Sequence, residues 1–158
     1  MSEKILVLGV GNTLLKDDGI GPQVIAALDR KTAWPHGALV ELRDGGTLGL
    51  VLLPEIEAAT AVIVVDAANF GGAPGEVRVF ESEAMDVWLG GARSSAHEVA
   101  LADLMGAALM SGSMPARRAL VGIAPLSTEW GLEPTPEVAG SIPLACAKIQ
   151  AIIGRWAA

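Results

Sequence analysis

The chain has 158 residues, of which 51% are hydrophobic, and a formal net charge of −7 at pH 7. This length suits one domain with a single core, so residues 1–158 are expected to form one domain. The acidic balance and the scarcity of aromatic residues exclude broad nucleic-acid binding, which needs phosphate neutralisation and base stacking. No apolar run reaches the ~18 to 20 residues of a membrane span, and the N-terminus lacks a signal-peptide pattern. With one cysteine, Cys146, these features predict a cytoplasmic protein with neither nucleic acid nor membrane as partner.

Apolar runs alternate with helical patterns along the chain. The last helix is expected to begin with Thr135 as N-cap and Pro136 at its first position. The helix that His97 opens is expected to bury a face that includes Ala108 and Leu109. The alternation predicts an α/β fold, a three-layer αβα domain whose mostly parallel sheet carries helices on both faces. The predicted strands are 4–10, 38–43, 61–65, 76–80 (near a sheet edge) and 119–124, and the predicted helices are 19–31, 48–59, 82–89, 97–112 and 135–156.

The first strand runs into a glycine-rich turn that resembles a nucleotide-binding loop. Gly9 and Gly11 match the first two glycines of a dinucleotide-binding motif, but Leu14 stands at the third. No Gly-Lys-Ser/Thr sequence follows, so a phosphate-binding P-loop is also a poor match. A nucleotide-dependent α/β enzyme that uses the Gly9/Gly11 loop is kept as an alternative. The turn ends in Asp17 and Asp18, which it presents at the carboxyl end of a strand, where open α/β sheets form their sites.

Acids follow three predicted strands, and a histidine opens a helix. Asp18, Asp44 and Asp66 would share one edge of a parallel sheet, and His97 would join them from its helix. Carboxylates and an imidazole suit zinc, iron or nickel, with open positions for water or substrate, and they also suit general acid–base chemistry. Each residue also has a plain structural interpretation: Asp18 as a helix cap, Asp44 and Asp66 as turn residues, and His97 as a helix-terminal residue. Asp17 is expected to face solvent or to cap the helix.

Residues 9–21, Gly-Val-Gly-Asn-Thr-Leu-Leu-Lys-Asp-Asp-Gly-Ile-Gly, resemble the N-terminal motif of the hydrogenase maturation endopeptidases. Further blocks resemble the same family in the same order, and the resemblance covers about residues 4–150. These blocks are Asp44-Gly45-Gly46-Thr47, Val64-Val65-Asp66-Ala67 with Pro74-Gly75, His97-Glu98-Val99-Ala100-Leu101-Ala102-Asp103-Leu104, Val121-Gly122-Ile123-Ala124-Pro125 and Gly131-Leu132.

The resemblance implies a twisted, mostly parallel sheet between helix layers and an endopeptidase activity. Its substrate would be the nickel-loaded large-subunit precursor of a nickel-iron hydrogenase, from which it removes a short C-terminal peptide. The family's metal-contacting trio maps onto Asp18, Asp66 and His97, where nickel belongs to the precursor and other divalent metals could substitute. Asp18 and Asp66 are candidates for catalysis as well, and Asp44 is a candidate for catalysis or substrate positioning. An aspartic-type and a metal-assisted mechanism both stay open, a monomer is favoured, and a non-catalytic nickel-dependent binding module or chaperone for the precursor is the second alternative.

Overall fold

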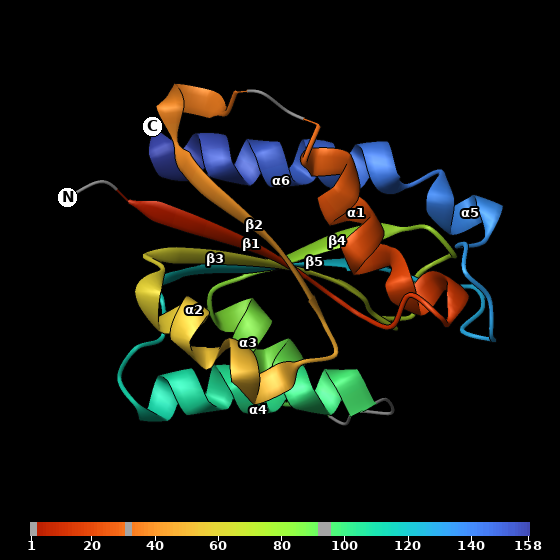
Figure 1. Cartoon of the computed structure of the whole chain (residues 1–158), viewed down its shortest axis with the longest axis horizontal. Coiled ribbons are helices and arrows are strands. Elements are labelled where there is room, and N and C mark those ends of the chain that lie inside the picture. Colours follow the sequence, from red (N-terminus) through yellow and green to blue (C-terminus); the bar gives the residue numbers. More distant parts are fainter. Residues whose placement is uncertain (1–2, 31–32, 92–95) are drawn as a thin grey trace.

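One mostly parallel sheet of five strands forms the centre of the molecule (Figure 1). The structure is a computed structural model that describes residues 3–30, 33–91 and 96–158, with the side chains of residues 96–98 outside this description. The strand order is β2-β1-β3-β5-β4, and only β4 runs antiparallel, against β5 at one edge. The strands are β1 (Lys4–Val10), β2 (Leu39–Gly46), β3 (Ala61–Ala67), β4 (Val77–Glu81) and β5 (Arg117–Ile123).

Helices cover both faces of the sheet, so the predicted three-layer α/β fold is confirmed (Figure 1). On one face lie α1 and α6, and on the other lie α2, α3 and α4. The helices are α1 (Ile20–Leu28), α2 (Leu53–Ala58), α3 (Glu83–Leu89), α4 (Ala96–Met110), α5 (Pro136–Ala139) and α6 (Ile142–Ala157), with single 3₁₀ turns η1 (Lys16–Gly19), η2 (Pro35–Gly37) and η3 (Gly49–Leu52).

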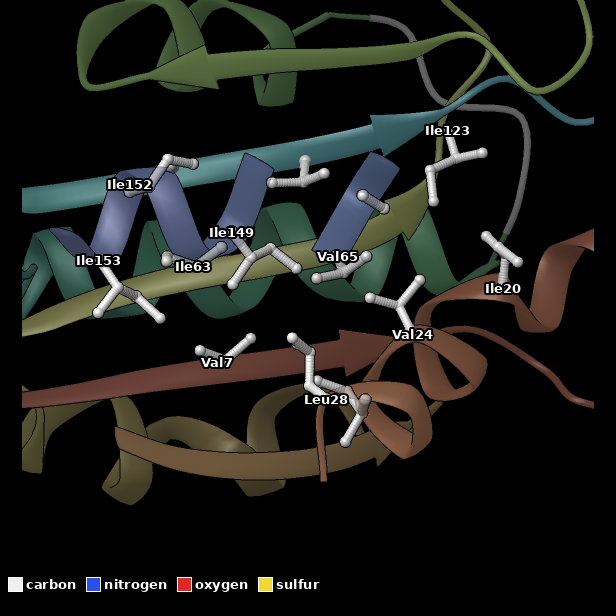
Figure 2. Close-up of a cluster of buried hydrophobic side chains, with 14 of the residues drawn as sticks. Val7, Ile20, Val24, Leu28, Ile63, Val65, Ile123, Ile149, Ile152 and Ile153 are labelled. Carbon is white, nitrogen blue, oxygen red and sulfur yellow. The ribbon is translucent and has the colours of Figure 1, made fainter. Parts of the chain in front are cut away.

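Each face of the sheet has its own apolar core, because successive side chains of a strand point to opposite faces. Ile63 and Val65 of β3 pack with Ile149 of α6 on the α1/α6 face, as Figure 2 shows. Val62 and Val64 of the same strand pack on the α2–α4 face. The whole of β3 is therefore buried, as expected for a central parallel strand that is covered on both sides.

The register places the carboxyl ends of β1, β2 and β3 at one level. Gly9 of β1 pairs with Asp44 of β2 on one side and with Val65 of β3 on the other. Asp66 lies one residue further along and pairs with Gly122 of β5. The expectation that the acids following these strands share one edge of the sheet is confirmed for Asp44 and Asp66.

Several predicted boundaries differ from the structure. The strand predicted at 61–65 extends to Ala67, so Asp66 lies inside β3. The segment predicted as one helix at 48–59 is η3 followed by α2. The predicted C-terminal helix is divided into α5 and α6, because Pro143, in the first turn of α6, has no N–H with which to continue a preceding helix. Leu109 is exposed, since Ala108 takes the inward position and the next residue is rotated by about 100° around the helix.

One apolar stretch, Pro136–Ala157, is long enough by composition to cross a membrane, with a mean hydropathy of 1.2. The expectation that no uninterrupted apolar run reaches the length of a span is not contradicted, because Glu137, Lys148 and Arg155 lie within this stretch. In the fold, Ala145, Ile149 and Ile153 of α6 pack against the sheet. This packing accounts for the apolar character of the helix, since the core helix of a globular domain passes the same test.

Replacing Ile63 by Ala should lower the free energy of unfolding by about 2–5 kcal/mol, because the cavity would open in the centre of the sheet. Val87→Ala, at an exposed position of α3, is the matched control and should stay within about 0.5 kcal/mol of the unmutated chain. Urea unfolding of the three proteins measures the difference. Equal losses at the two positions would contradict the assignment of the core.

Candidate functional site

The turn between β1 and α1 packs so closely on the strands that several of its positions admit only glycine. A Cβ atom at Gly21 would lie 2.5 Å from the carbonyl oxygen of Val65 in β3. A Cβ atom at Gly9 would lie 2.6 Å from the carbonyl oxygen of Gly21, and Gly11 has a φ of +136° beside the backbone of Asp18. The glycines therefore serve close packing of η1 and α1 onto the ends of β1 and β3.

The amides of this turn are used within the chain. The N–H of Asn12 donates to Oδ2 of Asp18 at 3.1 Å, and the N–H of Leu14 donates to Oδ1 of Asn12 at 2.9 Å. A carboxylate thus accepts where a phosphate-binding loop would offer its amides to a ligand. The loop gives no support to the nucleotide-dependent alternative, since packing explains both Gly9 and Gly11.

Asp18 is buried in η1, and η1 lies against β3. The N-cap position of α1 is Gly19, which has no side chain with which to cap the helix. Oδ2 of Asp18 accepts the Asn12 amide, which holds the acid against the turn. Asp18 therefore lies at the sheet edge where the sequence indicated a site, and its interpretation as a helix cap stays a prediction.

Asp66 is buried near the end of β3. By the alternation along the strand it belongs to the same face as Val62 and Val64, the face that α4 covers. The first half of α4 lies at the same edge of the sheet, because Ala100 lines a small pocket of about 10 Å³ together with Val10 and other residues at that edge.

His97 lies in the first turn of α4, one turn before Ala100, so its backbone belongs to this edge and face. Its side chain is outside the described residues. Among the described residues, no three His, Cys, Asp or Glu side chains form a group that could hold a metal. The trio of Asp18, Asp66 and His97 therefore stays a prediction. Two buried carboxylates and an imidazole are nevertheless a donor set that suits nickel.

Asp44 has a different environment. It is exposed, and its Oδ1 accepts the N–H of Gly46 at 3.0 Å, which is the turn interaction that the sequence indicated. The register shifts at this point of β2, and Asp44 lies on the same sheet face as Val40 and Leu42, opposite to that of Asp66. Asp44 thus borders the site from the other side of the sheet.

Asp17 is the residue that sequence reasoning misplaced. It is fully buried, and its carboxylate holds the segment between β5 and α5. Oδ2 accepts the N–H groups of Leu126 and Ser127, both at 2.9 Å, and Oδ1 accepts the N–H of Thr135 at 2.6 Å. The hydroxyl of Thr135 donates to the same carboxylate, at 2.8 Å from Oδ2, so Thr135 stands at the predicted N-cap position without capping the helix.

Burial raises the pKa of Asp17, but its hydrogen bonds from Ser127, Thr135 and Leu126 together outweigh this effect and hold the pKa below its ordinary value. The acid therefore stays ionised while it joins two loops. No local motif signals this role, because the partners lie 109 to 118 residues away in sequence. The hint of this role in the sequence is that two acids are adjacent and the predicted metal-binding trio uses only Asp18.

The chain matches a family model described as hydrogenase maturation protease over residues 22–152. It is 37% identical over 155 residues to the hydrogenase expression/formation protein HupD of Rhodobacter capsulatus, covering 98% of this chain and 73% of that protein. It is 35% identical to the hydrogenase 2 maturation protease of Escherichia coli over 95% of this chain and 90% of that protein. The solved structure of the hydrogenase maturating endopeptidase HybD from Escherichia coli is similar with a TM-score of 0.88 and 34% identity, covering 97% of this chain and 93% of that one.

Replacing Asp17 by Asn should lower the free energy of unfolding by about 1–3 kcal/mol at pH 7, because the new amide group would face backbone donors. Asp29→Asn, at an exposed position after α1, is the control and should change little. Since the folded-state pKa of Asp17 lies below 3.8, its contribution is present above pH 3.8 and is lost as the pH falls through the folded-state value. Urea unfolding at pH 7 and pH 3 measures both effects, and a constant difference between the two pH values would contradict the account.

Proposed function

The chain belongs to the hydrogenase maturation protease family, and we propose that it removes a short peptide from the C-terminus of the nickel-loaded large-subunit precursor of a nickel-iron hydrogenase. The observation that carries the proposal is the similarity to an endopeptidase structure along almost the whole chain. The buried acids Asp18 and Asp66 at one sheet edge support it, because they lie where an open α/β sheet forms its site.

The proposed roles follow from the position of each side chain. Asp18, Asp66 and His97 bind the nickel that the precursor carries, which brings the scissile peptide to the carboxyl edge of the sheet. Nickel held by these three residues would supply a positive charge beside the scissile peptide. A carboxylate at this edge orients the attacking water and accepts its proton. A precursor without nickel lacks this point of attachment, so cleavage would depend on completed metal insertion.

The burial of Asp18 and Asp66 also has a chemical consequence. Charges interact more strongly where water is excluded than on an open surface. Two buried carboxylates at the edge therefore attract a divalent ion more strongly than two carboxylates on an open surface would. Asp44, which is exposed and lies on the other sheet face, is not part of the proposed trio, and its proposed role is to contact the peptide or its water.

The direct test is the intact mass of a matched large-subunit precursor, nickel-loaded or nickel-free, after incubation with this protein. Loss of a short C-terminal peptide from the loaded form alone is the expected result. Cleavage of both forms would keep the protease and overturn the nickel dependence. Binding of the loaded form without any cleavage would replace the proposal with a nickel-dependent binding module.

Replacing Asp18, Asp66 or His97 by Ala should each slow cleavage of the loaded precursor by roughly 100-fold or more, since each substitution removes a ligand or a proton acceptor. Asp29→Ala, an exposed acid after α1, is the matched control and should cleave at the normal rate. Circular dichroism and thermal unfolding show whether each variant stays folded. A folded His97→Ala protein with normal cleavage would remove His97 from the trio.

Asp44→Asn separates a chemical role of Asp44 from its role in the turn. Asn retains the oxygen that accepts the Gly46 N–H, so the turn should be kept while the charge is lost. We expect normal binding of the loaded precursor and cleavage slowed by roughly 100-fold. An unchanged cleavage rate would leave Asp44 with the turn role alone.

A further inference from the structure

Two loops are joined side by side at the carboxyl edge of the sheet, one after β1 and one between β5 and α5. Leu15 and Gly131 form an isolated parallel bridge. The N–H of Gly131 donates to the carbonyl of Leu14 at 2.9 Å, and the N–H of Lys16 donates to the carbonyl of Gly131 at 3.0 Å. Together with the buried carboxylate of Asp17, these bonds fix the second loop against the first.

The joined loops expose large apolar side chains. Trp130 is 77% exposed and Leu132 is 72% exposed, and Leu14 on the first loop is about half exposed. We call these three residues the joined-loop surface. Single exposed apolar residues are common, but an exposed Trp and two Leu on hydrogen-bonded backbones form a preordered contact surface. Trp is also the residue type most enriched among the energetically dominant positions of protein interfaces.

The border of this surface is acidic. The side chain of Glu129 is 83% exposed, and Glu133 is exposed as well. Lys16 forms an ion pair with Glu129, with its Nζ 3.7 Å from the Glu129 carboxylate. This charge favours an apolar partner segment with basic residues beside it. A second copy of this chain is disfavoured, because it would bring two acidic borders together.

The joined-loop surface includes a residue that is close to Asp18 along the chain. Leu14 is four residues before Asp18, and the Asp18 N–H donates to the carbonyl of Leu15 at 2.9 Å. A protein whose C-terminal segment reaches Asp18 therefore comes close to the joined loops.

We propose that the joined-loop surface of Leu14, Trp130 and Leu132 binds an apolar segment with flanking basic residues on the large-subunit precursor. This inference rests on the proposed function, since it names the surface by which the same site holds its substrate. The surface supplies affinity, and the acids at the edge supply the chemistry. Asp17 is a positioning residue in this arrangement, because it holds the loop that carries Trp130 and Leu132.

The test compares cleavage of the nickel-loaded precursor by the unmutated chain with cleavage by Trp130→Ala and by Leu132→Ser. Each variant should raise KM about tenfold or more, with a smaller effect on kcat. Leu109→Ser and Met110→Ser are the matched controls. Both residues are exposed at the C-terminal end of α4, Leu109 by 67% and Met110 by 91%, so these substitutions should leave KM unchanged. Raising the salt concentration should raise the KM of the unmutated chain if basic residues meet the acidic border.

The outcomes separate the two proposals. Cleavage by the unmutated chain with an unchanged KM in folded Trp130→Ala and Leu132→Ser proteins would overturn the joined-loop surface and keep the proposed function. No cleavage by the unmutated chain would overturn the function, and the Kd of the loaded precursor for the same variants would then decide the surface. A dimer of the unmutated chain that Trp130→Ala converts to a monomer would assign the surface to a second copy and overturn the proposal.

Discussion

The close approach of η1 and α1 to the ends of β1 and β3 is the constraint on which the rest of the site depends. The backbone at Gly9, Gly11 and Gly21 leaves no room for a Cβ atom, and Gly11 also has a positive φ. Because the helix begins directly over the strand ends, Asp18 is buried at the same edge as Asp66. Close packing thus explains why the glycines resemble those of a nucleotide-binding loop although the turn's amides bind groups of the chain itself.

Two adjacent acids carry out different tasks because the 3₁₀ turn points them in different directions. Asp17 accepts hydrogen bonds from Leu126, Ser127 and Thr135, and it is a structural carboxylate. The carboxylate of Asp18 accepts the N–H of Asn12 within its own turn, and Asp18 is buried at the sheet edge. The position of Asp18 is therefore fixed twice, by the close packing at the glycines and by the loop that Asp17 holds.

The strands and their order along the chain follow from the sequence, because continuous β-branched runs such as 61–65 identify buried parallel strands. The shared edge for Asp44 and Asp66 follows from parallel pairing. The role of Asp17 does not, since its partners lie more than 100 residues away and hydrogen bonds over such distances leave no periodic pattern. The division at Pro143 could have been predicted from the proline, whereas the exposure of Leu109 follows only once the inward face of α4 is known. The opposite faces of Asp44 and Asp66 become visible only once the register of β2 is known.

We propose that this packing brings Asp18, Asp66 and His97 together as one metal-binding group. The most direct measurement is a crystal structure of this protein soaked with Ni²⁺, with data collected at the nickel absorption edge. We expect an anomalous peak in ligand contact with both carboxylates and with the imidazole of His97. Nickel bound elsewhere, or ordered Asp18 and Asp66 side chains too far apart to share an ion, would contradict it.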